Sequence, residues 1–148
     1  MTVLPAIDYR QGPLPNVDYP TYRPFWDGVR AGEIRLPRCA DCGKFHWYPQ
    51  IMCPFCRRGN IEFVRVGQRG KVYTWTTVSY PFLPAYAERL PYIVVFVEFP
   101  EAPGVRFISN MLDAKPEEMR AGLSVEAVFH PVDERVTLPL FRLVRDGC

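Results

Sequence analysis

The sequence contains no apolar stretch close to the roughly 20 residues that a membrane-spanning helix requires. Its first fifteen residues, MTVLPAIDYRQGPLP, also lack the basic and then apolar order of a secretion signal. We therefore expect a cytoplasmic protein that does not enter the membrane. Thiols stay reduced in the cytoplasm, so paired cysteines there are more often metal ligands than disulfides.

The sequence also lacks the usual patterns of catalytic groups. It has only two histidines, His46 and His130, and we interpret both as ordinary surface or hydrogen-bonding residues. Ser79, Ser109 and Ser124 stand in no nucleophile elbow or triad pattern. No two acidic residues have the setting of a general acid and base. The chain is therefore not expected to be an enzyme on its own.

A length of 148 residues, with 48% hydrophobic and 14% aromatic residues, fits one globular domain or one domain with a small appendage. Residues 1–20 contain four prolines and one glycine without periodicity, which predicts an extended arm. We expect a helix and a zinc ribbon over residues 21–66, and a β-barrel over residues 67–148.

Charge is distributed unevenly, although the net charge is only +2. Residues 30–71 contain nine basic and three acidic residues, a net of +6, so the rest of the chain sums to −4. Such a basic segment indicates a phosphate-bearing partner, such as nucleic acid or coenzyme A. A solvated basic surface is the alternative.

The stretch CADCGKFHWYPQIMCPFC contains two Cys-x-x-Cys pairs separated by ten residues. The four predicted metal ligands are Cys39, Cys42, Cys53 and Cys56. Each pair places two thiolates on a tight turn, for which Gly43 permits a positive φ and Pro54 adds stiffness. Four thiolates leave no open position on the metal, which favours a structural zinc, with rubredoxin-like iron as the alternative. Cys148 is interpreted as a free thiol.

The segment RPFWDGVRAG predicts a short amphipathic helix, with Pro24 in its first turn and Gly32 after its last. Beyond the second cysteine pair the pattern changes to strands. Strands are predicted at 61–66, 71–80, 92–99, 105–112, 123–130 and 138–144, with a short helix at 115–122. From residue 71 this is the element order of a five-stranded OB-fold barrel, although other small β-barrels share it.

The loop YPFLPAYAERLPY, residues 80–92, joins the first two barrel strands and contains three prolines, three tyrosines and one phenylalanine. In an OB-fold this loop is often part of the ligand face, where aromatic rings stack on bases or line a channel for an apolar tail. Packing on the end of the barrel is the alternative reading.

The segments FWDGVRAGEIRLPRCADCG, YPQIMCPFC, GKVYTWTTV, PYIVVFVEF and GVRFISNML occur in that order. Together they resemble a family of small acyl-CoA-associated proteins that join a helical segment and a rubredoxin-like zinc ribbon to an OB-fold. The resemblance covers about residues 18–145. It implies a mainly β protein without catalytic residues that is a partner of thiolase-fold enzymes. Those partners are thiolases acting with HMG-CoA synthase, thiolase-like acyltransferases, and sterol-carrier-type thiolases or aldolases, and some members are bound to hot-dog-fold hydratases.

The four cysteines match the ribbon of that family, which offers no firm positions for a CoA ligand. We expect the phosphates of CoA at Arg35, Arg38 and Lys44, because such side chains suit phosphate oxygens. We expect the pantetheine or acyl arm at Trp26, Tyr80 and Phe82. Plain packing or solvation is the alternative for all six.

The leading hypothesis is a non-catalytic, zinc-containing subunit that binds acyl-CoA and completes a thiolase-type complex. In such a complex the ribbon and barrel bridge the subunits and help to form the surface that holds CoA. One alternative is an OB-fold protein that binds single-stranded nucleic acid, although the basic excess is modest for that use. Another is a rubredoxin-like electron carrier.

Overall fold

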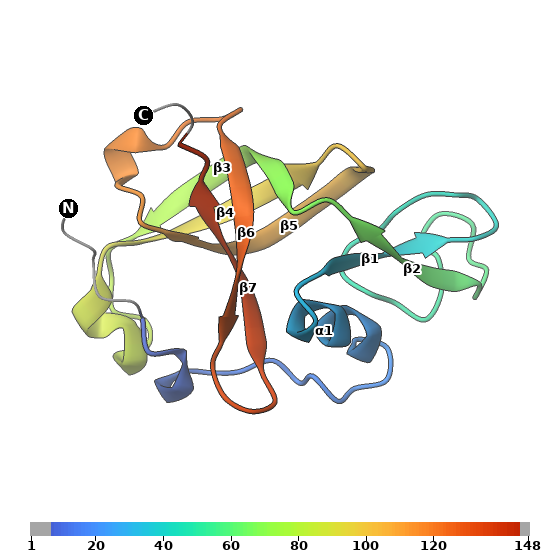
Figure 1. Cartoon of the computed structure of the whole chain (residues 1–148), viewed down its shortest axis with the longest axis horizontal. Coiled ribbons are helices and arrows are strands. Elements are labelled where there is room, and N and C mark those ends of the chain that lie inside the picture. The colour runs from blue at the N-terminus through green and yellow to red at the C-terminus, as the bar shows by residue number, and fades with distance from the viewer. Residues whose placement is uncertain (1–6, 146–148) are drawn as a thin grey trace.

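The structure is a computed structural model that describes residues 7–145. It has a closed barrel of five strands beside a smaller part with one helix and a two-stranded sheet (Figure 1). The smaller part contains α1 (Arg23–Arg30), β1 (Ile34–Cys39) and β2 (Ile61–Val66). The barrel contains β3 (Arg69–Val78), β4 (Tyr92–Phe99), β5 (Ala102–Leu112), β6 (Ser124–Pro131) and β7 (Thr137–Leu143). Three short 3₁₀ helices are η1 (Tyr9–Gln11), η2 (Pro84–Arg89) and η3 (Pro116–Glu118).

The barrel strands follow the order β3-β4-β5-β7-β6, and β6 pairs with β3 to close the barrel. All neighbouring pairs are antiparallel except β5 and β7, which are parallel. This is the strand order of an OB-fold, so the predicted barrel is confirmed. A Cβ atom at Gly70 would lie 2.6 Å from the carbonyl oxygen of Glu98, so only glycine allows β3 to pass this close to β4.

Helix α1 begins and ends as its sequence predicts. Pro24 lies in its first turn, and Gly32 follows its last turn with a φ of 78°. The N–H of Gly32 donates to the carbonyl of Val29 at 3.0 Å, and that of Glu33 to the carbonyl of Gly28 at 2.8 Å. These two bonds form a Schellman motif, which satisfies carbonyls that the helix end leaves free.

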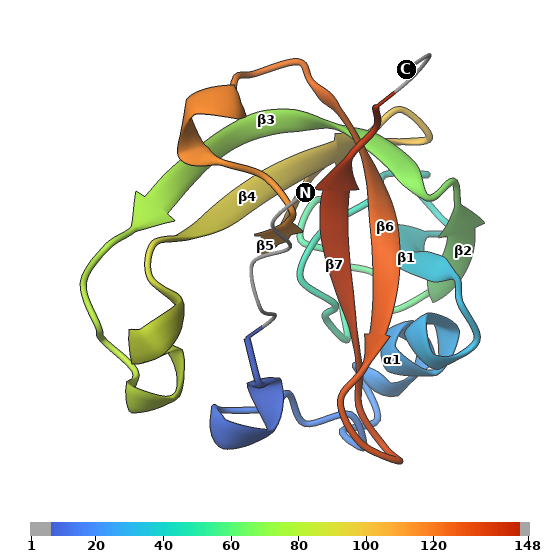
Figure 2. The same cartoon turned by 60° about the vertical axis from the view of Figure 1, so that its left-hand side comes forward.

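One continuous core joins the smaller part to the barrel. Phe107 on β5 lies at its centre, with its ring 5.8 Å from that of Phe25 on α1 and 4.8 Å from that of Trp47 in the ribbon. The same ring lies 5.9 Å from that of Phe141 on β7. In Figure 2, α1 lies against β6 and β1. Its side chains Phe25, Trp26 and Val29 belong to the same buried cluster as residues of the barrel. The ribbon is therefore held against the barrel by packing.

The sequence did not predict strand β1, which pairs antiparallel with β2 from Ile34 opposite Val66 to Cys39 opposite Ile61. Pro37 lies inside this strand, opposite Phe63. Proline has no N–H to donate in a sheet ladder, which argues against a central strand. The side of β1 away from β2 pairs with no third strand, so proline is tolerated there. On that side, away from β2, the carbonyl of Pro37 accepts a hydrogen bond from the N–H of His46 at 3.1 Å.

The predicted helix over residues 115–122 is wrong in extent, because only the single 3₁₀ turn of η3 forms. Met119 ends that turn in an extended conformation, with ψ of 135°, and its side chain is buried in the core. The chain therefore leaves the helical path at Met119, after one turn.

Part of the predicted arm packs on the barrel. Tyr9 is buried, and its hydroxyl oxygen accepts a hydrogen bond from the side-chain amide of Asn110 at 3.0 Å. Within residues 7–145, no helix has both the length and the apolar character that crossing a membrane demands.

Candidate metal centre and exposed surfaces

The four cysteines of the two Cys-x-x-Cys pairs converge at the end of the ribbon, with all four sulfur atoms within 4.8 Å of one another. The Sγ atoms of Cys39 and Cys56 are 3.5 Å apart, and those of Cys42 and Cys53 are 3.6 Å apart. Each of these contacts joins one sulfur from each pair. A tetrahedral zinc with Zn–S distances of about 2.3 Å places its sulfurs about 3.8 Å apart, so the cluster fits such an ion.

Both pairs form the same tight turn, in which backbone N–H groups point at sulfur. The N–H of Cys42 lies 3.5 Å from the Sγ of Cys39, and the N–H of Cys56 lies 3.5 Å from the Sγ of Cys53. The N–H of Phe55 lies 3.4 Å from the same Cys53 sulfur. Donors aimed at sulfur stabilise thiolates, which are the form that binds metal.

The residue after each pair has a left-handed backbone. Gly43 has a φ of 76°, and its N–H donates to the carbonyl of Cys39 at 2.8 Å. Arg57 has a φ of 65°, and its N–H donates to the carbonyl of Cys53 at 2.9 Å. The two turns are therefore alike in geometry, but only the first has the residue that adopts a positive φ without strain.

The Cys53 thiol ionises unusually easily. Its burial opposes ionisation, but hydrogen bonds from the N–H groups of Cys56 and Phe55 and from neighbouring thiols outweigh burial and lower its pKa to about 6. The same neighbouring thiols raise the pKa of Cys56 to about 11, so ionisation within the second pair is favoured at Cys53. This supports the assignment of the cluster as a metal site.

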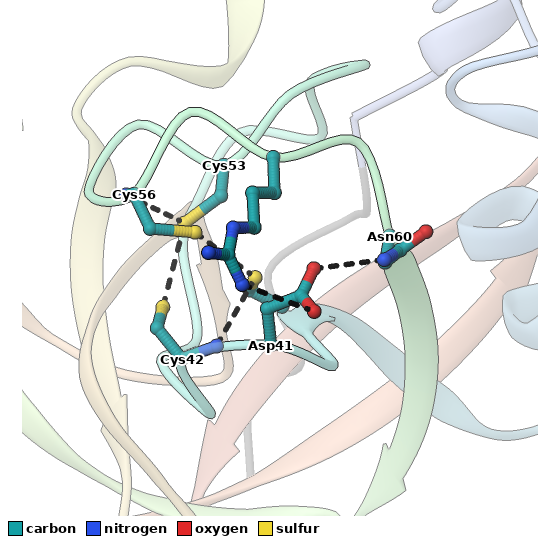
Figure 3. A network of polar contacts seen from close by, with 7 residues as sticks. Asp41, Cys42, Cys53, Cys56 and Asn60 are labelled. Carbon is teal, nitrogen blue, oxygen red and sulfur yellow. Dashed lines mark hydrogen bonds and ion pairs between the residues drawn. The ribbon is translucent and has the colours of Figure 1, made fainter.

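A polar network links the first cysteine turn to the second turn and to β2 (Figure 3). The carboxylate of Asp41 accepts a hydrogen bond from the side-chain amide of Asn60 at 2.8 Å. Its other oxygen lies 3.7 Å from the Nη1 atom of Arg58, just after Cys56. The N–H of Ala40 donates to the carbonyl of Asn60 at 2.8 Å. These contacts hold the two turns in register around the four thiols.

The three cationic residues predicted to bind CoA phosphates all lie on or beside the ribbon. The Nε atom of Arg35 is 2.8 Å from a carboxylate oxygen of Glu33, so this cation is already paired. Arg38 donates to the carbonyl of Gly43 at 3.2 Å and lies 3.5 Å from Glu62. The ammonium of Lys44 lies over the Phe55 ring at 4.9 Å, without a carboxylate partner among the described residues.

The three residues predicted to hold the acyl arm are not gathered at the ribbon. Trp26 is only 7% exposed and belongs to the core cluster, which leaves little of its surface for a ligand. Tyr80 and Phe82 are 66% and 72% exposed, and their rings contact each other at 4.9 Å. They lie in the β3–β4 loop, which carries η2 at the end of the barrel opposite the ribbon (Figure 1). The six predicted residues therefore do not form one site in this chain.

The interpretation of His46 as a surface or hydrogen-bonding residue is wrong. Its side chain is only 4% exposed, and neither ring nitrogen has a hydrogen-bond partner among the described residues. Burial lowers the pKa of this imidazole below its usual 6.5. His130 is half-buried, with its ring 5.9 Å from that of Tyr9. The interpretation of Cys148 falls outside the described residues.

Sequence reasoning missed a group of exposed apolar side chains at the ribbon. Ile51, Met52 and Phe55 are 73%, 51% and 58% exposed, although they lie within five residues of one another. The sequence did contain a signal for this exposure. A short loop whose cysteines face a metal has little room to bury large neighbouring side chains. Met52 and Phe55 flank those cysteines directly.

Two family models match successive parts of the chain. The ChsH2 rubredoxin-like zinc ribbon domain matches residues 26–62, and the ChsH2 C-terminal OB-fold domain matches residues 63–130. A DUF35 domain-containing scaffold protein of Methanocaldococcus jannaschii is 34% identical over 66% of this chain and 67% of its own length.

Other relatives are subunits of CoA enzymes. A probable enoyl-CoA hydratase alpha subunit of Thermomonospora curvata is 29% identical over 80% of this chain, which spans only 36% of that protein. The benzoylsuccinyl-CoA thiolase subunit BbsA of Thauera aromatica is 29% identical over 75% of this chain and 74% of its own. A solved structure of an Ltp2–ChsH2(DUF35) aldolase has a chain that superposes with a TM-score of 0.75 at 26% identity, covering 87% of this chain and 98% of that chain.

Proposed function

Because the chain belongs to the DUF35 family, in which a ChsH2-type zinc ribbon precedes an OB-fold, we propose that it is a non-catalytic scaffold subunit of a thiolase-type enzyme complex. The partner carries out the condensation, acyl transfer or retro-aldol cleavage of an acyl-CoA with its own catalytic residues. Relatives named as a scaffold protein, a thiolase subunit and a component of an aldolase support this proposal.

The observation that carries the proposal is the joining of the four-thiol cluster to the barrel by one core. All four thiols face one another, so a bound zinc has a complete tetrahedral shell with no position for substrate. Phe107 connects the ribbon and α1 to the barrel. A metal site of this kind stabilises the fold, and two parts packed on one core suit a subunit that positions another protein.

For acyl-CoA we propose a site shared with the partner enzyme, in which this chain contributes cations from the ribbon. Arg38 is 43% exposed in its side chain, so it has donors for phosphate oxygens, whereas Lys44 lies over the exposed Phe55 ring and faces the partner enzyme itself. Arg35 is the weaker choice, because Glu33 already pairs with it. We expect the complex to act in the cytoplasm, where thiols stay available for metal.

Co-purification followed by activity measurement tests the proposal. A tagged chain produced in its source cells is expected to recover a thiolase-type enzyme, identified by mass spectrometry. The recovered complex turns over an acyl-CoA, whereas the chain purified alone does not. Recovery of no CoA enzyme, or thioester turnover by the isolated chain at an enzymatic rate, would contradict the proposal.

Titration of CoA into the isolated chain and into the complex then tests the shared site, because tighter binding is expected only in the complex.

A further inference from the structure

Three large apolar side chains next to or within the second cysteine pair in the sequence are exposed to water. We call Ile51, Met52 and Phe55 the ribbon-tip patch; their exposed fractions are 73%, 51% and 58%. Soluble proteins expose single apolar side chains routinely, whereas a group of them points to a surface that another molecule covers. In this ribbon the exposure is built into the turn, because Phe55 lies between two cysteines and its own N–H is directed at the Cys53 sulfur.

The patch has a cationic rim. Lys44 lies over the Phe55 ring with its ammonium 4.9 Å from the centroid, and Arg57 and Arg58 follow the second cysteine pair. Only Asp41 supplies a carboxylate within residues 39–60, and it lies 3.7 Å from Arg58. Lys44 therefore lies beside an exposed apolar ring without a carboxylate partner among the described residues. Arg57, next to Cys56 in the sequence, has no such partner there either.

This combination selects one kind of occupant. A second copy of the same face would bring Lys44 and Arg57 against like charges, which disfavours self-association. A protein surface with an apolar recess edged by carboxylates matches both the apolar centre and the charge of the rim. The cysteine turns hold the patch in one shape before binding, which reduces the entropy lost on association.

We propose that the ribbon-tip patch is the surface by which this chain docks on the thiolase-type subunit, with Lys44 and Arg57 meeting carboxylates at its edge. The inference rests on the proposed function and names the part of the chain that makes the contact. Tyr80 and Phe82 form an exposed aromatic pair at the opposite end of the barrel and serve as the matched control.

The test uses the thiolase-type enzyme that the wild-type chain recovers, purified and titrated by biolayer interferometry. The double variant Ile51→Ser/Phe55→Ser is expected to raise the Kd about tenfold or more, because truncated anchors at an interface centre have effects of that size. The control Tyr80→Ser/Phe82→Ser is expected to change the Kd less than about threefold. Lys44→Glu is expected to slow association and to reduce its dependence on salt.

Metal content and melting temperature of each variant are measured first, so that lost binding is not lost folding. A photo-crosslinking amino acid at position 55 gives a second readout in an otherwise unchanged chain, and it is expected to join the enzyme covalently. Recovery of no CoA enzyme by the wild type refutes the proposed function. Equal binding by the wild type and the ribbon-tip double variant, with no crosslink from position 55, refutes the docking surface alone.

Two other outcomes also overturn the docking surface. The first is sedimentation of the chain with vesicles of phosphatidylglycerol and phosphatidylcholine, lost in Ile51→Ser/Phe55→Ser, while enzyme binding stays unchanged. The second is a dimer of the isolated chain that the same variant abolishes, again without an effect on enzyme binding.

Discussion

The loop of the ribbon that carries the second cysteine pair and the barrel use their large apolar residues in opposite ways. In the barrel, Val95, Val97 and Phe107 point inward and are buried, so the core holds the strands together. In the ribbon, Cys39 and Cys53 are buried while Ile51 and Phe55 face water. A small loop held by a metal does not need an apolar core, and its large side chains become available for contact with another molecule. The two parts should therefore fail under different conditions.

The largest effect is expected from opening the thiol cluster. Cys39→Ser removes one of four thiolates, and structural zinc in small domains contributes about 10 kcal/mol or more to folding. We expect loss of bound metal and of ordered structure in the ribbon, with much of the barrel's circular dichroism retained. Metal analysis by mass spectrometry, together with thermal melting, measures both. The metal analysis also separates zinc from iron, and an iron site would in addition colour the protein.

Ala40→Ser is the matched control for that change, since it places the same hydroxyl one residue away at an exposed position. It is expected to keep the full metal content. Full zinc and an unchanged melting temperature in Cys39→Ser would contradict a structural metal site.

The next largest effect is expected at the junction of the two parts. Phe107→Ala leaves a cavity among the rings of Phe25, Trp47 and Phe141, and such changes cost about 3–5 kcal/mol. Urea denaturation is expected to show this loss in both the barrel and the ribbon. Ile108→Ala changes the neighbouring residue, which is 52% exposed, and should cost less than about 1 kcal/mol. Equal costs for the two variants would mean that the ring cluster does not join the parts.

A smaller effect is expected from acid through His46, whose pKa is lowered by burial. The unfolded imidazole takes up a proton near pH 6.5, whereas the folded one resists protonation. The unfolded state then binds more protons, so the contribution to stability is complete above about pH 6.5 and declines as the pH falls towards the lowered pKa of the folded state. With zinc in excess, His46→Leu should show a shallower loss of unfolding free energy between pH 7.5 and 6 than the wild type. His130→Gln is the control, and a slope in His46→Leu like that of the wild type would contradict the assignment.

The smallest effects are expected from the two residues that follow the cysteine pairs. Gly43→Ala places a Cβ atom on a left-handed backbone, with its nearest neighbour 3.7 Å away, so only backbone strain of about 1 kcal/mol is expected. Arg57→Gly relieves similar strain, offset in part by the greater freedom of glycine in the unfolded chain, and should raise stability by less than about 1 kcal/mol. Both are measured as shifts in the urea midpoint. Gly59→Ala lacks a positive φ and serves as control; a larger shift there than in Gly43→Ala would show that strain is not the cause.

Local patterns predicted most of the elements. Cysteine spacing, Pro24 and Gly32 at the helix ends, and the alternation of the barrel strands depend on neighbouring residues, and each appears in the structure. Strand β1 escaped prediction because Pro37 is tolerated only where one side of the strand is free, which depends on the absence of a third strand. The sequence could not show that the six residues predicted to contact CoA lie apart, because the distance between the ribbon and the β3–β4 loop is set by the whole fold.

The sequence by itself determined that four cysteines on two tight turns would meet and that five strands would follow in the order of an OB-fold barrel. Both results come from spacing and alternation along the chain, which short-range geometry controls. Only the tertiary structure decided which apolar residues are buried. Trp26 and His46 lie inside, whereas Ile51 and Phe55 face solvent, although all four lie within thirty residues. Burial depends on which distant segments pack against a side chain, and that is a property of the folded molecule.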